Sequence, residues 1–162
     1  MPTVHILSGL IGSGKSTLAR RLERELPALR VSLDEWVVGL FGAEMPDPLT
    51  GEWWSDRCGR CARFAYGVAR QALAAGVDVV LDCGFLERWQ RDEARAWAAA
   101  AGAGTKLYLV RTATSVRRTR IERRNLERGE TFSLVVTDAM FDALPWEPPG
   151  DDELAGGSII DT

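Results

Sequence analysis

The stretch Gly9-Leu10-Ile11-Gly12-Ser13-Gly14-Lys15-Ser16 decides the fold, because it matches the phosphate-binding pattern G-x-x-x-x-G-K-[ST] at every position. A short apolar run, Thr3 to Leu7, precedes it and is typical of a strand. The segment that follows, Lys15 to Leu26, has leucines every four residues and predicts a helix with one apolar face. A strand, a glycine-rich turn and a helix in this order predict a P-loop.

A P-loop binds phosphate through its backbone and two side chains. The glycines allow a tight turn whose N–H groups point at phosphate oxygens, and the helix N-terminus adds its positive dipole end. We expect Lys15 to reach the β- and γ-phosphates of a nucleoside triphosphate, and the Ser16 hydroxyl to be a ligand of Mg²⁺. The expected phosphate-binding residues are Gly12, Ser13, Gly14, Lys15, Ser16 and Thr17. The tetrapeptide N-K-x-D, typical of guanine-specific proteins, does not occur, which argues against a switch GTPase.

The rest of the chain alternates short β-branched runs with longer helical patterns. Further strands are predicted at 29–33, 77–81, 107–110 and around 159–160, and helices at 52–75, 87–101, 114–127 and 137–144. The stretch between about 36 and 51, with two glycines and two prolines, predicts an irregular surface loop. Such alternation predicts an α/β fold with a parallel sheet between two helical layers, in a single domain over residues 1–162.

Composition excludes several classes of protein. The chain has 162 residues, a net charge of −3 and three cysteines. The negative charge argues against non-specific binding to nucleic acid or to a membrane surface, and no apolar run approaches the roughly 20 residues that span a bilayer. An odd number of cysteines does not suit a closed disulfide framework, so we expect a protein of the reducing cytoplasm. The sequence leaves its oligomeric state open.

Two acidic residues follow predicted strands. Because the carboxyl ends of parallel strands share one edge of the sheet with the P-loop, Asp34 should lie across a cleft from Lys15. A carboxylate there could accept the proton of an attacking hydroxyl group; the alternative is that Asp34 only caps the next helix. Asp82 ends the third strand and could hold Mg²⁺, position an acceptor or support the P-loop, and the sequence does not choose among these roles.

The helix predicted at 114–127 carries five arginines. Arg120 and Arg124 are four residues apart and share one face, and Glu127-Arg128-Gly129 suits a hinge. We therefore expect a mobile lid over about 117–130, with Arg120 on the adenine and Arg124 on the phosphates. The alternative is a solvated basic helix.

The segment between the second and third strands, about 36–66, is the expected substrate-binding segment and holds six of the thirteen aromatic residues. Trp36 and Trp53 could form a stacking platform beside Asp34, and Arg88 could reach the substrate from the next helix. In the same segment and the helix that continues from it, Phe64, Val68 and Leu73 are interpreted as residues that pack on the sheet.

Two further patterns carry less chemistry. Cys58 and Cys61 form a C-x-x-C pair inside a predicted helix, where neither a zinc site nor a thioredoxin-like site is expected. The single histidine, His5, lies on the first strand away from the P-loop edge, which favours a packed residue over a catalytic base.

These motifs together resemble the small P-loop kinases, a group that includes chloramphenicol phosphotransferase, the zeta toxins and the kinase domain of polynucleotide kinases. The resemblance rests on the P-loop, on Leu33-Asp34, on Asp82-Cys83-Gly84-Phe85 and on the R-x-x-x-R-N pattern that ends at Asn125. It implies a five-stranded parallel sheet in the order 2-3-1-4-5, ATP with Mg²⁺, and Asp34 as the general base. Two positions depart from the polynucleotide kinase pattern: Val37, and Cys83-Gly84-Phe85 after Asp82. These departures argue against a nucleic-acid substrate.

The leading hypothesis is an ATP-dependent phosphotransferase that acts on a hydroxyl group of a small molecule, such as an antibiotic, a nucleoside or a sugar-like metabolite. A regulatory module that binds ATP and hydrolyses it slowly is one alternative. A kinase of nucleic-acid 5′-hydroxyl groups is the other.

Overall fold

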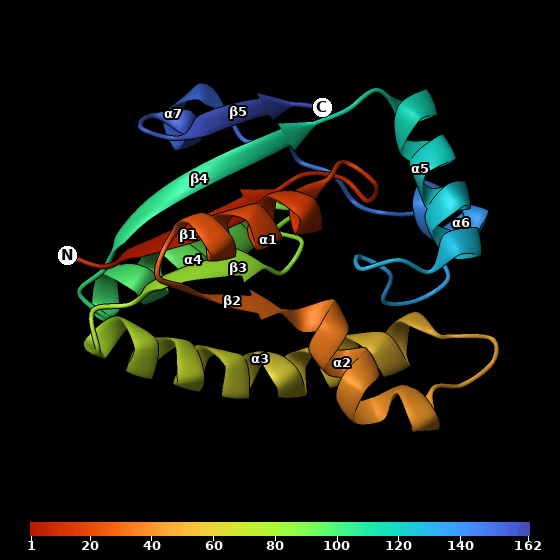
Figure 1. The fold of residues 1–162 in the computed structure, drawn as a ribbon, viewed down its shortest axis with the longest axis horizontal. Coiled ribbons are helices and arrows are strands. Elements are labelled where there is room, and N and C mark those ends of the chain that lie inside the picture. The colour runs from red at the N-terminus through yellow and green to blue at the C-terminus, as the bar shows by residue number, and fades with distance from the viewer.

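Five strands form one parallel sheet, in a computed structural model that describes residues 1–162 (Figure 1). Their order is β2-β3-β1-β4-β5, which confirms the 2-3-1-4-5 order implied by the resemblance. The strands are β1 (Thr3–Ser8), β2 (Ala28–Ser32), β3 (Asp78–Asp82), β4 (Gly104–Arg111) and β5 (Ser158–Asp161). Because all four pairings are parallel, every strand ends at the same edge of the sheet.

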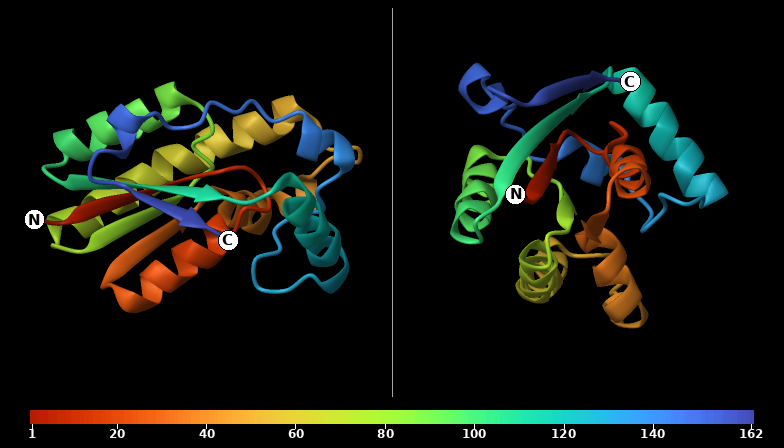
Figure 2. Two further views of the ribbon diagram at one scale, coloured as in Figure 1. Left: turned by 90° about the horizontal axis from the view of Figure 1, so that it is seen from above. Right: turned by 60° about the vertical axis from the view of Figure 1, so that its left-hand side comes forward.

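Helices cover both faces of the sheet. They are α1 (Lys15–Glu25), α2 (Leu33–Phe41), the 3₁₀ turn η1 (Gly42–Glu44), α3 (Gly51–Ala74), α4 (Arg88–Ala100), α5 (Thr114–Glu127), α6 (Asp138–Asp142) and α7 (Asp151–Leu154). Seen from above in Figure 2, α3 and α4 lie on one face of the sheet and α1 on the other. The helices α2, α5 and α6 gather beyond the carboxyl ends of the strands in Figure 1. The three layers match the α/β/α prediction.

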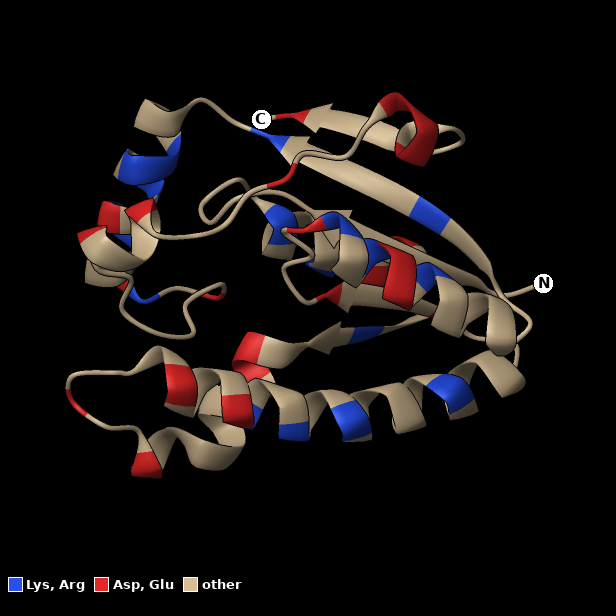
Figure 3. Cartoon of the chain, turned by 180° about the vertical axis from the view of Figure 1, so that it is seen from behind, with Lys and Arg blue, Asp and Glu red and all other residues tan.

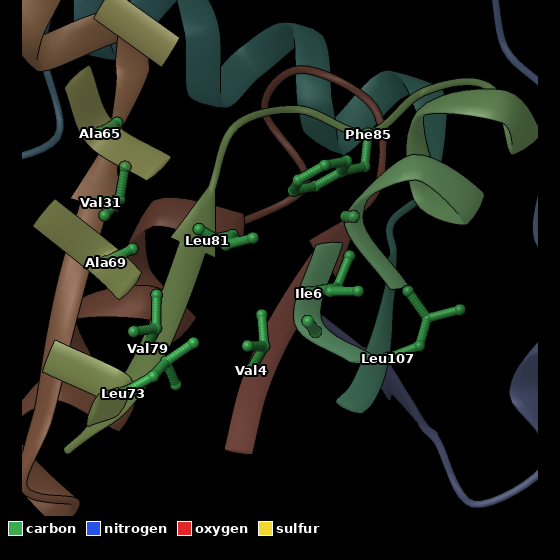
Figure 4. Close-up of a cluster of buried hydrophobic side chains, with 12 residues drawn as sticks. Val4, Ile6, Val31, Ala65, Ala69, Leu73, Val79, Leu81, Phe85 and Leu107 are labelled. Atoms are coloured by element: carbon green, nitrogen blue, oxygen red, sulfur yellow. The ribbon is translucent and has the colours of Figure 1, made fainter. Parts of the chain in front are cut away.

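Each face of the sheet has its own apolar core. On the α3 and α4 side, small helix residues such as Ala65 and Ala69 let the helices approach branched strand residues such as Val79 and Leu81 (Figure 4). On the other side, Leu18 and other apolar residues of α1 pack on β1, β3 and β4. Close packing of this kind holds the strands, and therefore their carboxyl ends, in defined positions.

The prediction of an irregular loop over 36–51 is wrong in its first half. Leu33 already opens α2, which runs to Phe41. Ser32 occupies the N-cap position, and Asp34 and Glu35 lie in the first turn, where carboxylates interact favourably with the helix dipole. The two prolines lie only after the helix has ended, so they do not interrupt it.

Two side chains of α3 do not pack on the sheet as expected. Phe64 is 77% exposed and Val68 is 43% exposed, whereas Leu73 is buried as expected. The helix buries the face that carries Ala65 and Ala69, so the side chains on its opposite face, such as Phe64, are exposed to solvent.

The remaining expectations on packed residues agree with the structure. His5 is buried, with its Nδ1 3.0 Å from the Tyr108 hydroxyl. Cys58 and Cys61 lie within α3 as free thiols. None of the helices combines the length and the apolarity that crossing a lipid bilayer requires.

A buried ion pair joins α4 to the short C-terminal helix α7. The Arg91 guanidinium, which is fully buried, donates to both carboxylate oxygens of Glu153 at 2.8 Å. Hydrogen bonds from Arg91, helped by those from Arg95, lower the pKa of Glu153 from 4.5 to about 2, against the burial of the carboxylate, which acts to raise it. Because this carboxylate has a depressed pKa in the folded state, its stabilisation is present above pH 4.5 and is lost as the pH falls toward 2.

We expect the substitution Glu153→Gln to lower the free energy of unfolding by about 3–5 kcal/mol, because it leaves the buried Arg91 charge without its partner. Urea denaturation at pH 7 measures the change. The matched control is Asp161→Asn, which breaks an exposed pair with Arg111 and should alter stability little. Equal effects of the two substitutions would contradict the structural role given to Glu153.

Candidate active site

The P-loop connects the end of β1 to the start of α1 with glycines where the space or the backbone demands them. A Cβ atom on Gly12 would lie 2.9 Å from the Arg117 carbonyl oxygen, so only glycine fits there. Gly14, the N-cap of α1, has a φ of 98°, which L-residues rarely adopt. No side chain caps α1, so its first N–H groups remain available to an anion. The loop therefore fits a phosphate group.

Ser13 is the one expected phosphate-binding residue that the cavity does not include. Its side chain is buried, and its backbone N–H donates to the Leu10 carbonyl at 3.1 Å. Its carbonyl accepts hydrogen bonds from the hydroxyl groups of Thr112 and Thr162. In this structure Ser13 holds the P-loop against the segment after β4 and the end of β5.

Lys15, Asp34 and Asp82 line one cavity of about 820 Å³ at the carboxyl edge of the sheet. Lys15 is half-buried, and its ammonium donates to the Leu10 carbonyl at 3.0 Å. Surrounding protein lowers the pKa of Lys15, while the charges of Asp82 and Asp34 act in the opposite direction. The predicted meeting of these three residues is therefore found in the structure.

The Asp34 carboxylate is open to the water of the cavity, yet protein atoms surround it on most sides. This desolvation and the charge of Asp82 raise the pKa of Asp34, against the opposing charges of Lys15 and Arg124. The alternative that Asp34 only caps the next helix is not found, because Ser32 is the N-cap of α2 and no side chain makes a capping hydrogen bond there. A carboxylate with a raised pKa is a better proton acceptor than an ordinary one.

Asp82 and Ser16 suit a divalent cation that also binds phosphate. Asp82 is buried, and one of its carboxylate oxygens, Oδ2, has no hydrogen-bond partner. Burial raises the pKa of Asp82, whereas Lys15 and the Ser16 hydroxyl lower it. No cluster of three or more potential metal-binding side chains exists, so the protein does not form a complete metal cage. These oxygens fit Mg²⁺, which usually completes its ligands with water and phosphate.

Three arginines of α5, Arg120, Arg123 and Arg124, line the cavity, and a fourth anchors the helix. Arg124 forms no ion pair, and its buried Nε atom has no partner. Arg120 lines the cavity and donates to the Thr162 hydroxyl at 2.9 Å. Arg117 is buried instead, and it donates to the Ile11 carbonyl of the P-loop at 3.1 Å. The helix thus presents Arg124 as a cation without a protein partner.

A network around Glu35 was not anticipated from the sequence. Arg30 of β2 donates to both carboxylate oxygens of Glu35, at 3.1 and 2.7 Å. Arg20 of α1 donates to the same carboxylate at 2.8 Å and to the Glu130 carbonyl at 2.6 Å. One guanidinium therefore links the phosphate-binding helix, the turn that carries Asp34 and the loop after α5.

Three of the residues expected at the substrate lie outside the cavity. Trp36 packs on the core beneath α2, because residues two apart on a helix face different directions and Asp34 points into the cavity. Trp53 stacks under Arg57, with 5.1 Å between the guanidinium carbon and the ring centre. The next residue, Trp54, lines the cavity in its place.

Arg88 is the third residue outside the cavity. It begins α4 on the solvent side and pairs with Asp152 and Asp92. The chain after β3 turns sharply at Gly84 and Phe85, both with positive φ, before α4 begins at Arg88. The Phe85 carbonyl accepts a hydrogen bond from Ser8 at 2.8 Å, which secures the turn to β1.

The far side of the cavity comes from a part of the chain to which the sequence had assigned no ligand. It is lined by Leu86 after β3 and by apolar residues of the segment between α5 and α7: Leu134, Val136, Met140, Ala143 and Leu144. The backbone N–H of Glu147 donates to the Leu86 carbonyl at 3.0 Å, which places the two segments side by side. Scattered apolar residues give no local signal, so only tertiary contacts could reveal this wall.

The arrangement has the parts that phosphoryl transfer requires. It places anion-binding N–H groups, an ammonium and an unpaired guanidinium around one space, with a carboxylate open to that space. The same parts also serve proteins that only bind or hydrolyse nucleotides.

Solved structures with a similar fold include several kinases. Kti12 from Chaetomium thermophilum, in complex with ADP-AlF3, has a TM-score of 0.73 at 20% identity, over 98% of this chain and 88% of that chain. A sugar kinase from Janibacter sp. HTCC2649 has a TM-score of 0.66 at 19% identity, over 99% and 86%. The APS kinase CysC from Mycobacterium tuberculosis, in complex with AMPPNP and APS, has a TM-score of 0.63 at 18% identity, over 99% and 88%. At these identities the likeness shows the fold alone.

A chain of the Pnkp1/Rnl/Hen1 RNA repair complex is also similar, with a TM-score of 0.65 at 19% identity over 87% of this chain and 42% of that chain. No curated protein matches the sequence. A family model described as an AAA domain matches residues 4–144, which include the P-loop, Asp34, Asp82 and α5. The chain therefore belongs to this AAA domain family, within the small P-loop kinase-like group of folds.

Proposed function

We propose that the chain transfers the γ-phosphoryl group of ATP to a hydroxyl group of a small molecule. One observation carries the proposal: Asp34 opens into the same cavity as Lys15 of the P-loop, at the same edge of the sheet. The kinases among the similar folds, which include sugar and APS kinases, support this class of reaction.

The P-loop and α5 bind the nucleotide in this proposal. The N–H groups at the start of α1 and the Lys15 ammonium bind the β- and γ-phosphates. Arg124 contacts the transferred phosphoryl group, and Arg120 lies against the adenine. Ser16 and Asp82 would hold Mg²⁺, which neutralises charge on the phosphates when it is bound.

Asp34 accepts the proton of the acceptor hydroxyl group. The acceptor oxygen forms a bond to the γ-phosphorus while the bond from that phosphorus to the β–γ bridging oxygen breaks, and ADP leaves. The proton then passes from Asp34 to solvent. Lys15 and Arg124 stabilise the negative charge that spreads over the phosphoryl oxygens in the transition state.

A nucleic-acid acceptor has one supporting observation, the similarity to a chain of an RNA repair complex. The charge distribution argues against it. Acidic and basic residues both occur along the helices drawn in Figure 3, and the net charge is −3.

The experiment is incubation of the protein with γ-labelled ATP, Mg²⁺ and a library of nucleosides, sugars and antibiotics, with a single-stranded oligonucleotide in a parallel reaction. A mass gain of one phosphate on a small molecule supports the proposal. Labelled oligonucleotide would favour the nucleic-acid kinase instead. Release of free phosphate that no acceptor stimulates would favour the slow ATPase.

We expect Lys15→Ala to abolish phosphoryl transfer and to weaken ATP binding, because it removes the ammonium from the phosphate site. Isothermal titration with AMPPNP measures the binding. The matched control is Lys106→Ala, the only other lysine, which lies 5.2 Å from the ring centre of Tyr108 and outside the cavity. Normal activity of the Lys15 variant would contradict the phosphate-site assignment.

We expect Asp34→Asn to lower kcat by roughly 10²–10⁴-fold while ATP binding is retained, because an amide does not accept the acceptor's proton. Steady-state kinetics with saturating ATP measures the loss. Asp92→Asn, on the exposed side of α4, is the control and should leave kcat unchanged. If the Asp34 variant turned over at the normal rate, Asp34 would have no part in the chemistry.

The proposal also sets the direction of the pH dependence. Because Asp34 must be ionised to accept a proton, and its surroundings raise its pKa above 3.8, activity should fall as the pH drops toward that raised pKa. A profile of kcat/KM between pH 4 and 8 measures this acid limb. The limb should disappear from the residual activity of Asp34→Asn, and its persistence there would assign it to another group.

A further inference from the structure

The active-site cavity has two chemically different ends. Every basic side chain that lines it belongs to α1 or α5: Lys15, Arg21, Arg24, Arg120, Arg123 and Arg124. The residues beyond them form an apolar wall, which we define as Trp54, Leu86, Leu134, Met140, Ala143 and Leu144. No Lys, Arg or His side chain lines the cavity outside α1 and α5.

Contacts hold the apolar wall in place. Leu134 and Met140 pack, together with Ile11 of the P-loop, on a small core of Ile121, Val136 and Phe141. The backbone bond from Glu147 to Leu86 ties the end of the wall to β3. Figure 1 shows the segment after α5 at the same end of the sheet as α2 and the P-loop. The wall is thus part of the packed structure rather than a loose surface.

The charges of the cavity do not suit an anionic acceptor. The phosphates of ATP would occupy Lys15 and Arg124 in the proposed function. The charged groups left near Asp34 are then acidic, because Asp82 and Glu35 are the other charges that act on it. A carboxylate or phosphate group placed against the apolar wall would lose its water without gaining a cation, which carries a penalty of several kcal/mol in general.

The wall does suit an uncharged ring. Half-buried apolar side chains such as Leu86, Met140 and Leu144 gain from covering apolar area, at about 25 cal/mol per Å². Trp54 offers a flat aromatic surface that can stack on a ring. Thr131 and Ser133 also line the cavity and provide hydroxyl groups for hydrogen bonds to polar substituents.

From this division of the cavity we infer that the acceptor is an uncharged alcohol with an apolar ring, and that the segment 131–144, Leu86 and Trp54 select it. The inference rests on the proposed function. It differs from the sequence prediction, which assigned selection of the acceptor to the segment 36–66, of which only Trp54 lines the cavity. It also separates this chain from kinases whose acceptors carry a negative charge.

The test compares matched pairs of alcohols in the presence of AMPPNP and Mg²⁺, so that binding is measured without transfer. The pairs are 2-phenylethanol with 4-(2-hydroxyethyl)benzoate, and cyclohexylmethanol with 4-(hydroxymethyl)cyclohexanecarboxylate. We expect calorimetry to show at least about tenfold tighter binding of the uncharged member of each pair. Equal or tighter binding of the acids, or binding of neither member, would overturn the inference.

The same pairs with ATP separate the two proposals. Uncharged alcohols that bind but receive no phosphate would refute the proposed function and leave the apolar wall intact. Transfer to the anionic members would support phosphotransfer and refute the inference about the wall.

A pair of variants locates the selecting segment. Leu144→Asp places a charge in the wall and should weaken binding of the uncharged alcohols at least about tenfold, with the Kd for AMPPNP unchanged. Leu40→Asp makes the same change on α2, at a side chain that is 68% exposed and outside the cavity, and should alter neither affinity. Circular dichroism checks that both variants are folded. An effect of Leu40→Asp with none of Leu144→Asp would return selection to the segment 36–66.

Discussion

One ammonium and two carboxylates meet at the carboxyl edge of the sheet, and the rest of the site depends on their balance. Lys15 belongs to the phosphate site, Asp82 to the cation site and Asp34 to the proposed acceptor site. Surrounding protein disfavours the charged form of each group, and the opposite charges around it restore that form in part. Each charge therefore requires the others to be held at a defined separation.

Polar contacts, rather than apolar packing alone, set that separation. Asp34 lies two residues after the end of the short strand β2, and the residue after it, Glu35, is held by Arg30 and Arg20. Since Arg20 lies five residues after Lys15 on α1, the network relates the phosphate site to the turn that carries Asp34. The bond from Arg20 to the Glu130 carbonyl extends this relation to the loop after α5. A displacement of that loop would therefore disturb the contacts of Glu35, the residue next to Asp34.

The sequence predicted the centre of the site well and its periphery poorly. The P-loop and the two strand-end acids were identifiable because short local patterns and one topological rule place them. Trp36 and Arg88 were misplaced because their orientations depend on where α2 begins and where the chain turns at Gly84 and Phe85. Ser13 was expected on phosphate from the motif, although its hydrogen bonds in this structure stay within the protein. A cytoplasmic location and a single domain over residues 1–162 remain predictions.

The sequence by itself determined that a P-loop stands between β1 and α1, that the sheet is parallel, and that Asp34 and Asp82 lie at its carboxyl edge. These features can be predicted from hydrophobic periodicity and from the spacing of glycines, which are patterns that extend over only a few residues. Only the tertiary structure decided that Arg20 reaches Glu35 and Glu130, that Arg91 is buried against Glu153, and that Leu86 and Leu144 share one wall. Those partners are far apart along the chain, and nothing local marks which of the many arginines or leucines will meet them. Packing of the helices against the sheet selects them.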